Sequence, residues 1–190
     1  MAAIAIDHLL KAVQTSSVGV AYVYCNYKAQ SDQTTSSLLA AILKQLVQAQ
    51  PSIAEPVARM HKQHNDRGTR PSLDEIFGAL QSVVADYSSV YVVIDALDEC
   101  LDGDGTRSQF LAKLQDLQRK TDLRLMATAR FIPGIADQFK PALTLEVQAS
   151  NEDVKRFIAG QIYRLPRCIQ RDAELQSVVQ ERIMEAVDGM

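Results

Sequence analysis

Three carboxylates crowd the end of one apolar run in this sequence. In "VYVVIDALDEC" (residues 90–100), five apolar residues precede Asp95, and Asp98 and Glu99 follow within four positions. Like charges this close repel each other where water is partly excluded, so the stretch needs a cation nearby. Mg²⁺ is the usual cation where phosphates share a site, because it takes one or two carboxylates and completes its shell with water and phosphate oxygens. The stretch therefore predicts a magnesium site at Asp95.

Asp98 and Glu99 lie slightly further along the chain and have a different expected role. Either carboxylate could orient or deprotonate a water that attacks a terminal phosphate, which makes both of them candidate catalytic residues. A structural role stays open for the same acids, which would then only end a strand or cap the helix that follows.

Strand-like and helical segments alternate along the chain, and these elements have to position the acids. Strands are expected in four runs rich in β-branched and apolar residues: 18–24, 90–94, 123–129 and 143–147. Helices are expected where apolar residues recur at helical spacing: 1–14, 38–47, 53–64, 72–87, 110–117, 151–163 and 172–187. Ser72 and Glu75 form a capping-box pattern, Asn151 is the expected N-cap of its helix, and residues 131–139 are expected to form a short turn.

Strands separated by helices predict an α/β fold with three layers and a largely parallel sheet. The strand before Asp95 is apolar throughout, which is typical of an interior strand buried on both faces. Ligands of such sheets gather at the carboxyl ends of the strands. Asp95 is therefore expected at the edge of the sheet where a ligand would bind.

Composition narrows the class of protein and its partners. The chain has 190 residues, enough for one domain with a sizeable core, and a net charge of -3, which gives no electrostatic reason to expect nucleic acid. No apolar run approaches the roughly 20 residues that a membrane helix needs, so no membrane partner is expected. The three cysteines include no C-x-x-C pair and are expected to be free thiols in a reducing compartment, consistent with a cytoplasmic location.

The stretch "VVIDALDE" resembles the extended Walker B motif of NACHT-type NTPases, which are members of the signal-transduction (STAND) class of P-loop proteins. In that motif an Asp ends the strand and is followed by a small residue, an apolar residue and two acids, as in residues 95–99 here. Four further segments look like successive blocks of fungal NACHT proteins, whose domain is also described as nephrocystin-like: "VAYVYCNYKAQ", "SLLAAILKQL", "LRLMATAR" and "NEDVKRFIAGQI". The closing "RIMEAVDGM" resembles the start of that family's "ADGMF" segment.

The resemblance implies a P-loop NTPase-type sheet and assigns a role to Arg130. "MATAR" would be the sensor strand, and the Arg130 guanidinium would contact the terminal phosphate of a nucleotide. A guanidinium at the carboxyl end of a strand suits bidentate contact with phosphate, and without nucleotide it could instead pair with Asp98 or Glu99.

The same resemblance divides the chain and names its partners. Residues 1–150 would be a partial NACHT core, and residues 151–190 would begin the helical region that follows it. The complete protein would bind ATP or ADP with Mg²⁺ and couple the nucleotide to self-association and signalling. An effector domain would precede this region, and ankyrin or WD repeats would follow it.

The phosphate loop of this class, G-x-x-x-x-G-K-[ST], has no counterpart here, because none of the eight glycines is followed by lysine. "MAAIAIDHL" resembles the helix directly after that loop, so the chain is expected to be a fragment that starts just after Walker A. The upstream DNA is then expected to encode the loop and the family's first strand, which lies between the sensor strand and the last strand. Without them the sheet would be incomplete, and this chain alone is expected to bind Mg²⁺–ATP weakly or not at all.

Two other functions stay open. One is a nucleotide-free scaffold for protein interactions that keeps the sheet, and the other is an ordinary metabolic ATPase. Specific nucleotide binding with slow turnover would favour the switch, rapid turnover by the chain alone would favour the metabolic enzyme, and no binding would favour the scaffold.

Overall fold

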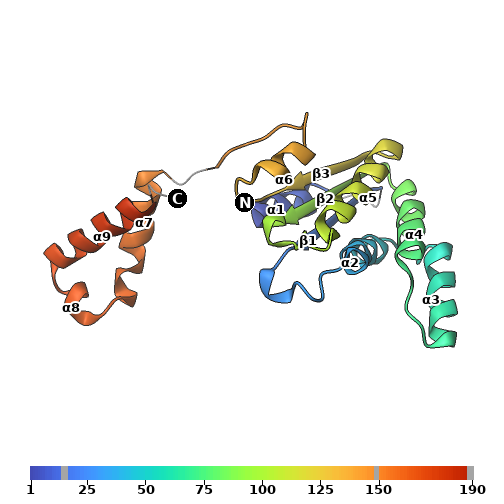
Figure 1. The fold of residues 1–190 in the computed structure, drawn as a ribbon, viewed down its shortest axis with the longest axis horizontal. Helices are drawn as coiled ribbons and strands as arrows, with labels where there is room; N and C mark the ends of the chain where they lie inside the picture. Colours follow the sequence, from blue (N-terminus) through green and yellow to red (C-terminus); the bar gives the residue numbers. More distant parts are fainter. Residues whose placement is uncertain (14–16, 148–149, 188–190) are drawn as a thin grey trace. The chain divides into compact units, whose positions relative to one another are not determined.

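The computed structural model describes residues 1–13, 17–147 and 150–187. The chain forms two compact units, Met1–Lys140 and Pro141–Met190. The first unit is an α/β domain built on a parallel sheet, and the second is helical (Figure 1). All four candidate site residues, Asp95, Asp98, Glu99 and Arg130, lie in the first unit.

The sheet of the first unit has three parallel strands in the order β1-β2-β3. They are β1 (Val18–Tyr24), β2 (Ser89–Asp95) and β3 (Leu123–Ala127). β2 lies in the middle and its run from Val92 to Ile94 is buried, which confirms the predicted interior strand. The register pairs Tyr24 with Asp95 and Ile94 with Ala127, so the three strands end side by side.

Alternation of side chains along the strands explains why helices cover both faces of the sheet. Ala21, Val92 and Ile94 belong to the main core, on the face covered by α2 (Thr35–Gln48), α4 (Leu73–Ala85) and α5 (Thr106–Lys120). Val93 points to the other face and packs with Ile6 of α1 (Ala2–Ala12) in a small separate cluster. The predicted layering is therefore present, with one helix on the second face among the described residues.

Two of the predicted helix boundaries have clear local causes. The Ser72 hydroxyl accepts the Glu75 N–H and the Glu75 carboxylate accepts the Ser72 N–H, which confirms the capping box at α4. The helix before it, α3 (Glu55–Arg67), ends at Gly68 in the left-handed region (φ 60°). The predicted turn at residues 131–139 instead contains a short helix, α6 (Pro133–Gln138), because Pro133 suits the first helical position.

The fourth predicted strand, at residues 143–147, is wrong. Leu143, Leu145 and Val147 are highly exposed, and no strand forms there. The alternation of apolar and polar residues is compatible with a strand, but a strand also needs a neighbouring strand to pair with its backbone N–H and C=O groups. β3 is an edge strand of the described sheet, and no described segment pairs with its outer edge.

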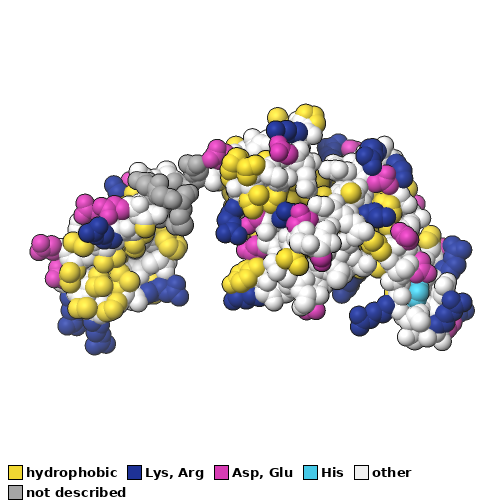
Figure 2. Space-filling model, in the orientation of Figure 1, with side chains coloured by type: hydrophobic (Ala, Val, Ile, Leu, Met, Phe, Trp, Pro, Cys, Tyr) yellow, Lys and Arg dark blue, Asp and Glu magenta, His cyan; other side chains and the backbone are white. Residues whose placement is uncertain are grey.

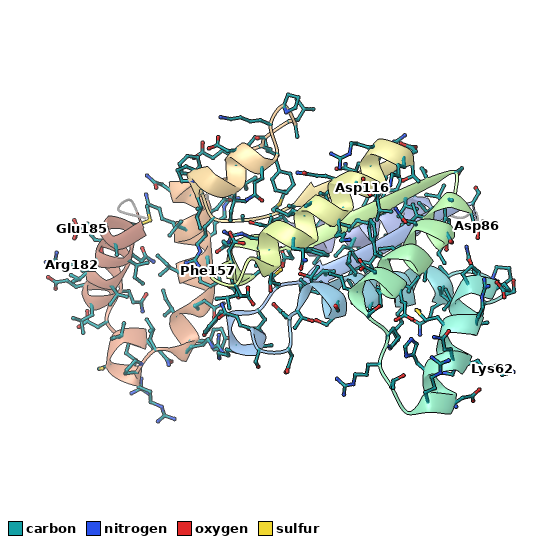
Figure 3. All side chains as sticks on the ribbon, turned by 45° about the vertical axis from the view of Figure 1, so that its right-hand side comes forward. Lys62, Asp86, Asp116, Phe157, Arg182 and Glu185 are labelled. Carbon is teal, nitrogen blue, oxygen red and sulfur yellow. The ribbon has the colours of Figure 1, made fainter. Side chains whose placement is uncertain are left out.

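In the second unit α7 (Asn151–Gln161) packs against α9 (Ala173–Val187). The short α8 (Arg167–Gln170) lies between these two helices in the sequence and contacts α9. The N-cap of α7 is Ser150, not the predicted Asn151, because Ser150 and Asp153 form a capping box. Phe157, labelled in Figure 3, is about two thirds exposed, and Figure 2 shows further apolar side chains gathered on the visible face of this unit. No helix of the described chain is both long enough and apolar enough to cross a bilayer.

Candidate functional site

A tight left-handed turn follows β2 and separates the three acids. Asp95 is the last residue of the strand, Ala96 has φ 54° and ψ 48°, and Leu97–Glu99 form a single 3-10 turn. Ala96 is the one residue other than glycine with positive φ in the described chain. The reversal of the backbone at Ala96 points Asp95, Asp98 and Glu99 toward different neighbours.

Asp95 is held by the neighbouring strand through Thr128. The Thr128 hydroxyl donates to Asp95 Oδ1 at 2.6 Å and accepts the Ala96 N–H at 3.0 Å. The Thr128 backbone also bridges the turn, because its N–H donates to Ile94 O at 2.9 Å and its carbonyl accepts from Leu97 N–H at 2.8 Å. One residue therefore contacts four consecutive positions, 94–97.

Sequence reasoning did not single out Thr128. It lies one position beyond β3, and its neighbour across the sheet is fixed by the register Ile94 to Ala127. One sequence feature does point to Thr128: a hydroxyl residue lies near the carboxyl end of one predicted parallel strand, and an acid directly follows another.

Asp98 pairs with Arg130, one of the two ion pairs expected for this arginine. Arg130 Nε donates to Asp98 Oδ2 at 2.6 Å, and the Arg130 backbone N–H donates to Oδ1 at 3.1 Å. The Asp98 side chain is only 4% exposed, whereas that of Arg130 is 80% exposed. Burial opposes ionisation of Asp98, but the hydrogen bonds from Arg130 outweigh it and lower the pKa of Asp98. The same pair raises the pKa of Arg130.

Glu99 makes structural contacts with the loop after β1. Its Oε2 accepts the Tyr27 N–H at 3.0 Å, and its carbonyl accepts from Gln30 Nε2 at 3.2 Å. The carboxylate thus helps to hold the short 3-10 turn Tyr27–Ala29. The structural alternative for the acids is therefore observed at Glu99, and its catalytic role stays a prediction.

Two buried thiols lie beneath the acids. The Cys25 N–H donates to Asp95 O at 2.9 Å, and the hydrogen bond between the Cys25 and Cys100 side chains, together with burial, raises the pKa of Cys25. Both cysteines are free and buried, while Cys168 is free and exposed. The predicted free thiols are present, and the Cys25–Cys100 pair forms part of an apolar floor below Asp95.

The donor set at Asp95 fits Mg²⁺ only in part. No group of three or more His, Cys, Asp or Glu side chains in the described part of the chain could hold a metal by itself. Asp95 Oδ1 is taken by Thr128, whereas Oδ2 has no hydrogen bond to a described residue. A single carboxylate oxygen suits Mg²⁺ that is mainly ligated by water and phosphate. The residues present therefore fit a phosphate-bound magnesium ion better than a metal held by protein alone.

The fold and the charged edge define an α/β domain with a parallel sheet, compatible with Rossmann-like and P-loop-like folds. Residues 1–130 match the family described as nephrocystin 3, N-terminal, and the chain belongs to that family. The matched range includes all the candidate site residues and Thr128. No curated protein matches the chain.

Proposed function

We propose that this chain is the Walker B and sensor part of a NACHT-type nucleotide switch. In the complete protein it would bind Mg²⁺–ATP or Mg²⁺–ADP and couple the nucleotide to self-association and signalling. The observation that carries the proposal is the Arg130–Asp98 pair beside Asp95, at the carboxyl ends of adjacent strands. An effector before this region, ankyrin or WD repeats after it, a cytoplasmic location and a fungal setting belong to the same proposal.

The geometry of Arg130 supports a sensor that can exchange partners. Only its Nε and its backbone N–H bond to Asp98, and its two terminal nitrogens have no hydrogen bond to a described residue. The exposed guanidinium can therefore first present its outer edge to a phosphate and then leave Asp98 for it.

Each group would then have one task. Bound Mg²⁺ would neutralise charge on the phosphate oxygens, and Asp95 would hold it through Oδ2. A phosphate that draws Arg130 away would leave the buried Asp98 carboxylate without its cation. Asp98 would then be free to orient a water or accept its proton, which is why we favour Asp98 over Glu99 as the catalytic acid.

The scaffold alternative also has a specific observation in its favour. The sequence contains no phosphate loop, and in switches of this kind the loop amides and lysine supply most of the phosphate contacts. We therefore expect this chain alone to bind nucleotide with a Kd no tighter than about 1 mM, a binding free energy of about -4 kcal/mol.

The test follows the Arg130 side-chain Nε–H resonance during titration with Mg²⁺–ATP. Arg124 is a matched internal control, because it lies on β3, the strand that precedes Arg130, and pairs with Asp122 through Nε and Nη2. We expect millimolar Mg²⁺–ATP to shift the Arg130 resonance and leave that of Arg124 in place. Equal shifts of both arginines, or none, would favour the scaffold, and rapid hydrolysis by the chain alone would favour a metabolic ATPase.

A further inference from the structure

We propose that Thr128 is a positioning residue that fixes the direction in which Asp95 presents its carboxylate to a metal ion. The inference rests on the proposed function, because it concerns how the candidate magnesium ligand is held. Thr128 would not itself contact the metal or the nucleotide.

The hydroxyl of Thr128 contacts both the carboxylate of Asp95 and the peptide group that follows Asp95. Its hydroxyl proton is committed to Asp95 Oδ1 at 2.6 Å, so rotation of the carboxylate would break a short charge-assisted bond. The hydroxyl oxygen accepts the N–H of Ala96, the next residue, at 3.0 Å. The same oxygen therefore holds the carboxylate and the peptide that follows it.

The backbone around Asp95 needs this support. Ala96 lies in the left-handed region, which is unfavourable for a residue with a Cβ atom and persists only where the surroundings over-determine it. Two backbone hydrogen bonds of Thr128 hold the turn on both sides: its carbonyl accepts the Leu97 N–H, and its N–H donates to the Ile94 carbonyl. The arrangement leaves Asp95 Oδ2 as the oxygen available for a metal.

Thr128 and Arg130 also divide the two acids between them. Residue 128 holds Asp95 and residue 130 holds Asp98, so the three-residue segment after β3 contacts both ends of the turn after β2. The hydroxyl of Thr128 and the guanidinium of Arg130 therefore act on different acids of the same turn.

The first test compares Thr128→Val, which has nearly the same shape but no hydroxyl, with Thr128→Ser, which keeps it. The probe is Mn²⁺ titrated in the presence of excess ATP, since the site fits a metal that phosphate also holds. Binding is followed by paramagnetic broadening of the Ala96 and Leu97 amide resonances. Groups that orient a metal ligand are typically worth 10–100-fold in affinity, so we expect Thr128→Val to weaken Mn²⁺ binding about tenfold. Thr128→Ser should stay within about twofold of the parent chain, since its hydroxyl can make the same bonds.

A second readout needs no metal. Hydrogen exchange at the Ala96 amide should accelerate in Thr128→Val and stay slow in Thr128→Ser, because that amide donates to the Thr128 hydroxyl. The urea midpoints of the variants show whether any loss is merely global unfolding.

The outcomes separate this inference from the proposed function. If Asp95→Asn removes Mn²⁺ binding but Thr128→Val binds as tightly as the parent chain, the positioning role is wrong and the metal role of Asp95 stands. If Asp95→Asn binds Mn²⁺ normally, the metal role itself is wrong. Weak binding by both Thr128→Val and Thr128→Ser would also overturn the proposal, since it would trace the effect to packing.

Discussion

Replacing Ala96 by glycine should leave the chain as stable as before or slightly more stable. This change normally destabilises a folded protein, because glycine gives the unfolded chain more freedom to lose. Ala96 is different because its backbone already has φ 54°, a conformation that glycine adopts without steric cost. The substitution therefore tests whether the turn between the acids is strained.

The magnitude follows from two opposing terms. The left-handed conformation costs an L-residue roughly 1–2 kcal/mol, which glycine would recover. Glycine adds roughly 0.5–1 kcal/mol of unfavourable backbone entropy. The net effect is between about 0 and 1.5 kcal/mol of added stability, provided that the hydrogen bonds made by Thr128 keep the turn in place.

Ala112→Gly is the matched control. Ala112 is exposed in the interior of α5, where the backbone is helical, and glycine there should cost about 1 kcal/mol. Urea unfolding followed by circular dichroism, with all three chains in one buffer, measures both effects. With an m-value of about 1–3 kcal/mol/M, the two variants should differ in midpoint by several tenths of a molar or more.

A loss of stability for Ala96→Gly equal to that of Ala112→Gly would refute the reasoning. It would mean that Ala96 is not held in the left-handed region in solution. The turn would then not separate Asp95 from Asp98, and the arrangement of the site would have to be different.

Three further outcomes follow from the structure. Gly19→Ala should destabilise the chain by about 0.5–2 kcal/mol, because a Cβ atom there would lie 2.7 Å from Leu46 Cδ2. Gly78→Ala on α4 should instead stabilise the chain, because a Cβ atom there meets nothing within 4 Å. Urea midpoints compare the two variants. A thiol reagent should modify the exposed Cys168 quickly and the two buried cysteines only after unfolding, and three equally fast thiols would contradict their burial. The Ser72 N–H and hydroxyl lower the pKa of Glu75 from 4.5 to about 2. The ionised Glu75 carboxylate therefore contributes stability above about pH 4.5, and this contribution is lost as the pH falls toward 2. The difference in urea midpoint between the parent chain and Glu75→Gln should shrink across that range.

The sequence predicted well those elements whose pattern is set by burial alone. The run 90–94 is apolar because both faces of β2 are covered, and the strand was found nearly at its true limits. The capping box at Ser72 was predictable because both partners lie within four residues of each other. In both cases the physical cause is local or is repeated at a fixed period.

The features that the sequence did not reveal depend on partners distant in the sequence. Residues 143–147 have an alternating pattern, but a strand also needs an adjacent edge, which no single segment reveals. The role of Thr128 depends on the register between β2 and β3, which pairs Ile94 with Ala127. The contact of Glu99 with Tyr27 joins residues 72 positions apart. The sequence could thus identify the charged groups of the site, and Arg130 as a partner for Asp98 or Glu99, but not the donors Thr128 and Tyr27.

The structure explains how three acids can stand so close together in one turn. Each carboxylate meets a different donor: Asp95 the hydroxyl of Thr128, Asp98 the guanidinium of Arg130, and Glu99 the N–H of Tyr27. Repulsion among the acids is therefore relieved within the fold, and the pair that involves the exposed Arg130 side chain can open without breaking a bond to the backbone of β2. A phosphate would compete at that pair, whereas a metal would meet Asp95 Oδ2, which has no hydrogen bond to a described residue. These separate contacts would let a phosphate and a metal act on neighbouring acids at once, as a nucleotide switch requires.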